Sequence, residues 1–262
     1  MVNIPMNSSA PLTKSTVLSI NQQKVSQAQN TQTILSINNG YSSSPQQPAA
    51  PPHSENSAPA VQTSSVQTSA PPVSIPMPKL CNPMQKGQKF PLENAGRLSK
   101  IRVCLGWNVT NSSCDVDVSA FLLNSSGKVI GDTWFVFYGQ EISPDASTTF
   151  AVDNRNDREI ISVDFNRLNS AVSKIVFVLT INEALEKHLS FSMVKDAYIR
   201  IINADNNSEL VSFKMDEYYS NVISMMIGEL YIHNGMWKFN AVGNGVARDL
   251  AGLCELYGVR VV

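Results

Sequence analysis

The pattern of hydrophobic and polar positions changes character near residue 79. From Lys79 onward, short apolar or alternating runs recur between turn residues, as is typical of β-strands. The run over residues 174–181 is apolar on both faces, which predicts a central strand. The other single strands are predicted over residues 99–105, 116–123, 134–138 and 160–165.

Two hairpins and two helices complete the predicted elements. Residues 198–202 and 210–213 flank one polar turn. Residues 228–233 and 236–242 flank Asn234 and Gly235, a strong two-residue hairpin signal. Asn182 is expected to cap a short helix through His188, and a last helix is expected from about residue 245 to Tyr257. The core side of that last helix is predicted to carry Leu250, Ala251, Leu253, Cys254 and Leu256, and Gly258 ends it. Many short strands with few helices predict a mainly β protein, a two-sheet β-sandwich with short helices and a C-terminal helix.

Residues 1–78 have a different composition from the rest. They contain three charged residues and one aromatic residue, and nine of the fourteen prolines lie between Pro45 and Pro78. So few large apolar side chains cannot offset the entropy lost on ordering, so we expect a disordered tail, with the globular domain over residues 79–262. A short alternating pattern at residues 16–21 recurs at 33–38. It is either chance similarity in a biased sequence or a pair of peptides that add to a sheet edge and bind protein partners.

Charge and cysteine usage narrow the function classes. The formal net charge is −1, without a basic stripe, so we expect no nucleic-acid binding. No apolar run approaches the roughly 20 residues that a membrane helix needs, and the first residues do not resemble a signal peptide. Four cysteines without metal-site spacing are expected to be reduced thiols, which favours a cytoplasmic location.

Acidic residues gather at two places that could supply oxygen ligands. Asp115 and Asp117 would point to the same face of a strand, about 7 Å apart. A loop with Asp153, Asn154, Asp157 and Glu159 follows two strands later. Calcium binds six to eight hard oxygen ligands, and these six residues could provide several of them. The alternatives are ordinary turn chemistry, or neutralisation of the acids by Arg155 and Arg158.

Several segments match a known family in order along residues 79–262. They are Lys86-Gly87, Leu105-Gly106-Trp107, residues 115–123, Phe137-Tyr138, Ser143-Pro144-Asp145, Asp153-Asn154, residues 175–178, residues 228–231, Trp237-Lys238-Phe239, residues 241–243 and Tyr257-Gly258-Val259. This part of the chain resembles the TerD-type tellurium-resistance family. The resemblance implies a calcium-binding β-sandwich linked to tellurite resistance and stress responses, with Asp115, Asp117, Asp153 and Asn154 among the ligands.

The loop departs from the family pattern. The family loop runs through several glycines to an Asp-Asp-Glu end, whereas here Arg155 and Arg158 stand in a shorter loop that reaches Glu159 directly. Glycines let a backbone curl around an ion, so their loss predicts one weak site instead of two.

Three functions follow as hypotheses. The first is a non-enzymatic, calcium-responsive binding module in stress response or signalling. The second is a small-ligand protein, because some eukaryotic members of the resembled family with Pro/Gln-rich tails are described as cyclic-AMP-binding proteins. The third is a structural interaction protein with a vestigial metal site. An enzyme is not expected, because the chain lacks a nucleophile elbow, a P-loop and a dinucleotide fingerprint.

Overall fold

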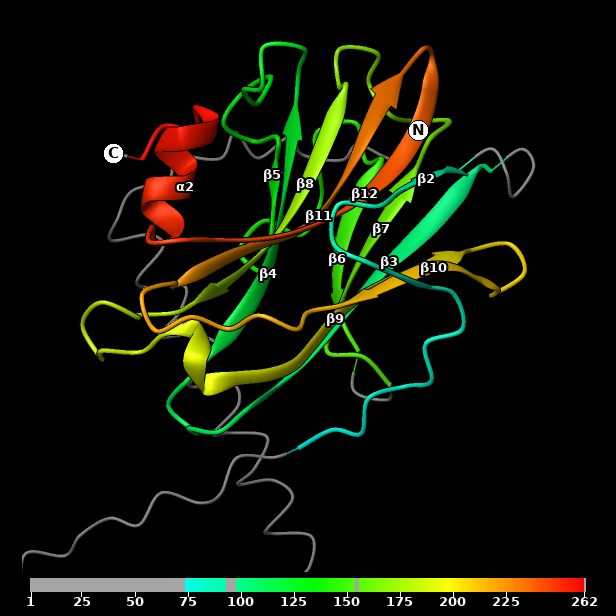
Figure 1. Cartoon of the computed structure of the whole chain (residues 1–262). Helices are drawn as coiled ribbons and strands as arrows, with labels where there is room; N and C mark the ends of the chain where they lie inside the picture. Colours follow the sequence, from blue (N-terminus) through cyan, green and yellow to red (C-terminus); the bar gives the residue numbers. More distant parts are fainter. Residues whose placement is uncertain (1–73, 93–97, 154–155, 262) are drawn as a thin grey trace, which may run out of the picture. The chain divides into compact units, whose positions relative to one another are not determined.

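The structure, a computed structural model, describes residues 74–92, 98–153 and 156–261. These residues form two six-stranded sheets packed face to face, as predicted (Figure 1). In sheet A the strand order is β1 (Pro83–Met84), β10 (Glu209–Lys214), β9 (Val194–Asn203), β3 (Lys100–Val109), β7 (Glu159–Asp164) and β6 (Thr148–Val152). In sheet B it is β2 (Lys89–Pro91), β12 (Met236–Val246), β11 (Ser224–His233), β8 (Lys174–Ile181), β4 (Val116–Leu123) and β5 (Phe135–Val136).

Strand pairing is antiparallel except where β1 runs parallel to β10. The β11–β12 hairpin turns at Asn234 (φ 54°) and Gly235 (φ 76°), the two positive angles that a type I′ turn requires. This confirms the predicted hairpin. The pairing of β9 with β10 confirms the other one.

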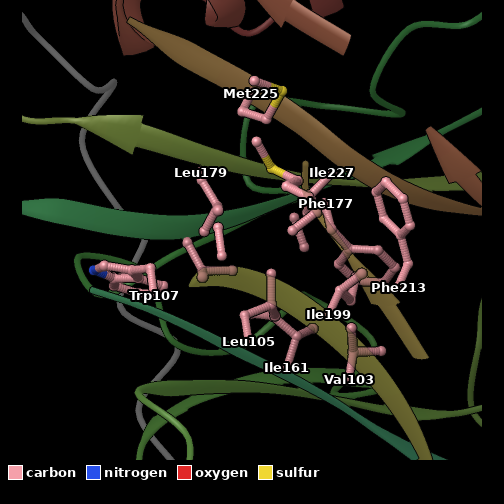
Figure 2. Packing of buried hydrophobic residues seen from close by; sticks show 14 of the residues in the cluster. Val103, Leu105, Trp107, Ile161, Phe177, Leu179, Ile199, Phe213, Met225 and Ile227 are labelled. Carbon is pink, nitrogen blue, oxygen red and sulfur yellow. The ribbon is translucent and has the colours of Figure 1, made fainter. Parts of the chain in front are cut away.

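The main core lies between the two sheets. Alternate residues of each strand point inward, and Figure 2 shows Leu105 and Ile199 of sheet A close to Phe177 and Ile227 of sheet B. All four side chains are fully buried. Burial of this kind contributes about 1.5–3 kcal/mol per large apolar side chain.

A second, smaller core lies on the other face of sheet B. There the helix α2 (Leu250–Tyr257) packs Leu253, Cys254 and Tyr257 against Phe121 and Val178. This helix explains why β4 is buried along its whole length and why β8 is apolar on both faces. The predicted central strand over residues 174–181 is therefore confirmed. The outer face of this strand packs against α2.

Helix α2 begins later than the sequence pattern indicates, because β12 continues to Val246. Its N-cap is Asp249, whose side chain accepts a hydrogen bond from the Gly252 amide (2.8 Å), and it ends at Gly258 with φ 82°. Leu256, predicted to face the core, is 38 % exposed, and Tyr257 takes the buried position. The register of the apolar face was wrong by one residue at this end.

Other local predictions need correction. The short helix predicted over residues 182–188 is a series of turns, because Glu183 (φ 50°) and His188 (φ 52°) adopt left-handed backbone angles that a right-handed helix excludes. The strand predicted over residues 134–138 is only Phe135–Val136. Strand β6 was not predicted. The repeat at residues 16–21 and 33–38 lies outside the described residues.

Candidate functional site

The two acidic segments meet at one end of the sandwich, where β4 and β7 begin. A Glu159 oxygen (Oε2) accepts a hydrogen bond of 2.7 Å from the Val118 amide, and this contact joins sheet A to sheet B. The Val118 amide points to the β5 side of β4, but β5 pairs only with Ala120 and Phe121. Glu159 thus binds a backbone amide beyond the end of the short β5 strand.

Glu159 and Asp117 are both buried, with 4 % and 8 % of their surface exposed. Both are acidic, and Glu159 binds the amide of the residue next to Asp117. Asp115 is exposed, and its carbonyl accepts a hydrogen bond from the Asn182 amide (2.8 Å). Buried carboxylates require hydrogen bonds or cations near them, so this end of the molecule is electrostatically unusual.

Tyr138 lies beside the same carboxylates. Burial raises the pKa of its phenol, and the negative charges of Asp117, Asp115 and Glu159 raise that pKa further. The charges of three predicted ligands thus act on the same phenol. We call Asp115, Asp117, Tyr138 and Glu159 the acidic end.

The loop between β6 and β7 is closed on itself by Asp153. The Asp153 amide donates to the Arg158 carbonyl (2.8 Å), and the Asp157 amide donates to Asp153 Oδ2 (3.2 Å). The Asp153 side chain thus caps the loop in which the sequence predicted further ligands. Asn154, another predicted ligand, lies outside the described residues, as does Arg155.

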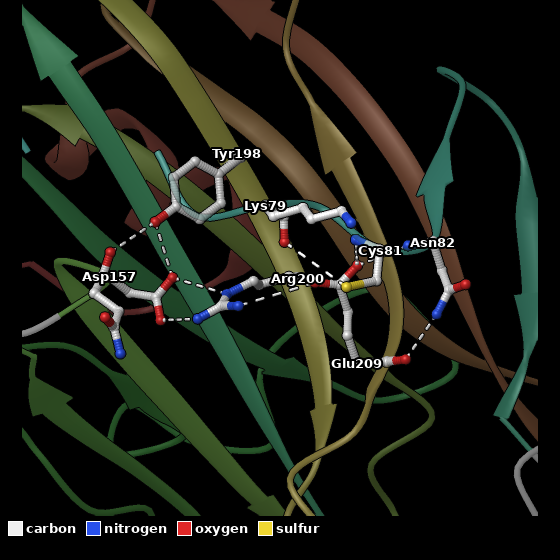
Figure 3. Close-up of polar contacts among 8 residues, drawn as sticks. Lys79, Cys81, Asn82, Asp157, Tyr198, Arg200 and Glu209 are labelled. Atoms are coloured by element: carbon white, nitrogen blue, oxygen red, sulfur yellow. Dashed lines mark hydrogen bonds and ion pairs between the residues drawn. The ribbon is translucent and has the colours of Figure 1, made fainter. Parts of the chain in front are cut away.

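Asp157 lies beside Tyr198 and Arg200 of β9, on the outer face of sheet A (Figure 3). Arg200 of β9 donates two hydrogen bonds to its carboxylate, from Nε (3.0 Å) and Nη2 (2.7 Å), and the Tyr198 hydroxyl donates a third (2.9 Å). The Asp157 side chain is only 3 % exposed. Burial lowers the pKa of Arg200, whereas the hydrogen bonds and charge of Asp157 raise it. The pKa of Arg200 is raised overall.

The Arg200 network continues to the start of the domain. Arg200 Nη1 lies 3.9 Å from Glu209 Oε2, and Glu209 Oε1 accepts the amides of Cys81 (2.8 Å) and Asn82 (2.9 Å). Neither Arg200 nor Glu209 was predicted as part of the site. A signal was present, since Tyr198 and Arg200 are polar positions that alternate with Ile199 and Ile201 in β9.

Arg158 contacts β3. Its backbone amide donates to the Leu105 carbonyl (2.8 Å), its Nε donates to the Trp107 carbonyl, and its guanidinium lies 5.7 Å from the centre of the Trp107 ring. Burial lowers the pKa of Arg158. The loop is therefore fixed to sheet A by one arginine from each side, Arg158 within it and Arg200 opposite it.

Across residues 74–92, 98–153 and 156–261, no three His, Cys, Asp or Glu side chains lie close enough together to hold a metal ion. Of the six predicted ligands, Asp115, Asp117 and Glu159 share the acidic end, and Asp153 caps the adjoining loop. Asp157 is held by Arg200.

Comparison with known proteins decides the family. The TerD domain matches residues 81–257, which is more than half of the chain. The chain belongs to the TerD family. The tellurium resistance protein TerD of Serratia marcescens is 40 % identical over 185 residues, which cover 67 % of this chain and 96 % of that protein. General stress protein 16U of Bacillus subtilis (strain 168) is 36 % identical over 189 residues, which cover 68 % of this chain and 97 % of that protein.

A solved structure described as a homologue of the telluride resistance protein TerD, from Streptomyces coelicolor A3(2), is also similar. It is 15 % identical, the match covers 63 % of this chain and all of that one, and the TM-score is 0.47. For this TerD-family chain, the matches to the tellurium resistance protein and to the general stress protein each cover about two thirds of its length. None of the helices in the described ranges is long and apolar enough to cross a membrane.

Gly106→Ala tests the packing that holds the Asp157 contact. A Cβ atom at position 106 would lie 2.3 Å from the Tyr198 hydroxyl, so the ring must shift and the hydroxyl must leave Asp157. We expect the free energy of unfolding to fall by about 1–3 kcal/mol in urea titrations, as for overpacked cores. Gly127→Ala is a poor control because Gly127 has φ 76°, so Gly131→Ala serves instead, with its nearest neighbour at 3.5 Å. Equal losses in the two variants would contradict the role of the Tyr198 contact.

Proposed function

We propose that this TerD-family chain is a non-enzymatic binding module of the stress-response type that responds to calcium through its acidic end. One observation carries the proposal: two buried acidic residues, Asp117 and Glu159, come from opposite sheets, and Glu159 binds the amide of the residue next to Asp117. Buried carboxylates of this kind repel one another unless cations or hydrogen bonds offset the repulsion. The relatives named for tellurium resistance and general stress support the stress-response part.

The donor chemistry of the acidic end fits a hard cation. Asp115, Asp117 and Glu159 supply carboxylate oxygens, and Asp153 adds another from the adjoining loop; oxygen is the ligand atom that calcium prefers. Asp157 does not fit, because Arg200 already holds both of its oxygens. The set is smaller than the six to eight ligands of a saturated calcium site, so we propose a weak site that water completes. When bound, calcium would supply positive charge to offset the carboxylate repulsion.

The response to calcium would be a movement of the carboxylates of the acidic end and of the loop between β6 and β7. The carboxylates of the acidic end do not form a cluster of three in the described structure, so they would have to approach one another on binding. Asp153 links such a movement to the loop, because its side chain accepts the Asp157 amide. Asp157 in turn is bound to Arg200 and Tyr198 on the outer face of sheet A. A change at the acidic end would therefore reach a surface where a partner can bind.

A thermal melt in calcium tests the proposal. At a concentration about tenfold above the dissociation constant, binding stabilises the folded state by about 1.4 kcal/mol. For a domain of this size that raises Tm by about 3–6 °C. Asp117→Asn should abolish the calcium-dependent shift. Asp216→Asn, the same change at an exposed aspartate, should retain it. An unchanged wild-type Tm at millimolar calcium would contradict the proposal.

A second candidate is a metal-independent interaction protein, and the Asp157–Arg200 pair favours it. This pair fixes the loop to sheet A with two short hydrogen bonds and needs no ion. The same melt separates the two candidates, because the metal-independent protein should melt at one temperature with and without calcium.

Cyclic AMP, the alternative small ligand, has less support from the cavities. Two that lie within the described residues have volumes of about 10 and 110 Å³. Pockets for drug-sized ligands usually measure roughly 300–1,000 Å³. A Tm increase with cyclic AMP but not with calcium would favour this ligand over our proposal.

A further inference from the structure

Residues 74–78, just before the first strand, contact the outer face of sheet A through one side chain. The Asn108 carboxamide makes both backbone hydrogen bonds to Ile75: the Ile75 amide donates to Asn108 Oδ1 (2.9 Å), and Asn108 Nδ2 donates to the Ile75 carbonyl (3.0 Å). A neighbouring β-strand offers an extended residue the same donor and acceptor. One asparagine at the end of β3 thus captures a peptide as a strand would.

Asn108 is held in position for this contact. Asn108 is only 5 % exposed, and its side chain has two further polar neighbours. Asp196 Oδ2 lies 3.4 Å from its Nδ2, and Arg158 Nη2 lies 3.5 Å from its Oδ1. A small cavity of about 10 Å³ adjoins the contact and is lined by Ile75, Pro76, Trp107, Asn108, Arg158 and Tyr198. These neighbours hold the Asn108 carboxamide in place beside Ile75.

The captured sequence is suited to this contact. Pro76 restricts the preceding residue, Ile75, to an extended backbone, which is the conformation that paired hydrogen bonds require. Proline also lacks an amide hydrogen, so no donor at position 76 is left without a partner. Ile75 is half-buried, whereas Pro76 and Met77 are exposed. An apolar residue followed by proline is therefore the feature that this face recognises.

The same tripeptide occurs a second time in the chain. Ile75-Pro76-Met77 has a copy at residues 4–6, Ile4-Pro5-Met6, which lies outside the described residues. The physical arguments for Ile75 apply equally to Ile4, because Pro5 imposes the same restriction on it. We propose that the face around Asn108 is a docking site for Ile-Pro-Met peptides, and that residues 4–6 are its second occupant, in competition with residues 75–77. This proposal does not depend on calcium binding.

Peptide binding to the full-length chain tests the proposal. The probe is a fluorescein-labelled peptide with the sequence of residues 1–9, and the readout is fluorescence anisotropy. The receptor is the full chain with Ile4→Ser and Ile75→Ser, in which both internal copies have lost their apolar anchor. We expect saturable binding to this receptor, and at least about tenfold weaker apparent binding to the wild-type chain, whose own copies compete.

Altered peptides provide controls that leave the protein fold untouched. Peptides with Ile4→Ser or Pro5→Ala should bind the double variant at least about tenfold more weakly than the native peptide. If the Ile75→Ser change lowers Tm, a receptor with Ile4→Ser and Pro76→Ala loosens residues 75–77 more gently and carries the same expectation. The proposal is overturned if no receptor variant shows saturable binding, or if the altered peptides bind as well as the native one.

Discussion

Replacing Arg200 with methionine should lower the free energy of unfolding by about 3–5 kcal/mol, the range measured when one partner of a buried ion pair is removed. Asp157 would then be left buried without its two charge-assisted hydrogen bonds, since its side chain is 3 % exposed and that of Arg200 is 16 % exposed. Among the side chains that the structure describes, the Tyr198 hydroxyl would remain as a donor to Asp157. Urea denaturation followed by tryptophan fluorescence measures the loss.

Two variants make this prediction sharp. The double variant Asp157→Asn/Arg200→Met removes both charges together and should recover part of the loss, because no buried charge then lacks a partner. Lys86→Met breaks an ion pair of similar length, 2.8 Å to Glu217, but at the surface, where the side chains are 45 % and 52 % exposed. It should cost far less than Arg200→Met, because solvent screens exposed ion pairs. A loss for Arg200→Met as small as that for Lys86→Met would contradict the account of the loop.

Replacing Phe177 with alanine should also lower the free energy of unfolding by about 3–5 kcal/mol, the usual cost of truncating a core phenylalanine. Phe177 is fully buried in β8, the strand between β4 and β11, and lies between the sheets with Leu105, Ile199 and Ile227 (Figure 2). The cavity would open in the centre of the sandwich, where the paired strands cannot easily close it. Urea denaturation gives the value.

The matched controls are Phe177→Leu and Ile232→Ala. Phe177→Leu keeps most of the volume and should cost less than about 1.5 kcal/mol. Ile232 is 40 % exposed near the end of β11, so its truncation should stay within about 0.5 kcal/mol. A cost for Phe177→Ala close to that of Ile232→Ala would show that β8 is not the centre of the core.

The sequence predicted those parts of the fold that depend on local rules. The strand over residues 174–181, the turn at Asn234 and the helix end at Gly258 each follow from composition within a few residues, and each is confirmed. The helix expected over residues 182–188 failed because the left-handed angle at Glu183 has no marker in the sequence. The exposed position of Leu256 likewise depends on tertiary packing, because α2 turns Leu253, Cys254 and Tyr257 toward sheet B.

The candidate site was predictable only in part. The spacing of Asp115 and Asp117 and the family resemblance directed attention to the acidic end. The contact between Asp157 and Arg200 could not be predicted, because the two residues are 43 positions apart and only the pairing of β3 with both β7 and β9 brings them together. The hydrogen bonds between Ile75 and Asn108 were equally unpredictable, because these residues lie 33 positions apart in the chain. Such contacts come from tertiary packing, which short-range patterns do not encode.

The tertiary contacts also give the loop a physical role. Asp157 joins the loop to the Arg200 network, and Arg158 joins it to Trp107 of β3. Asp153 closes the loop through the Asp157 amide. Two arginines hold it to sheet A, Arg158 from within the loop and Arg200 from β9. In this TerD-family chain, the described part of the loop is therefore held by ion pairing and by a cation over an aromatic ring.

Equilibrium dialysis of the full-length chain against radioactive calcium tests the central proposal most directly. We predict saturable binding of roughly one ion per chain at millimolar calcium, because the carboxylates of the acidic end are too few for two sites. Asp117→Asn should lose this binding, and Asp216→Asn should keep it. Absence of saturable binding to the wild-type chain, or equal binding by the Asp117→Asn variant, would contradict a calcium response at the acidic end.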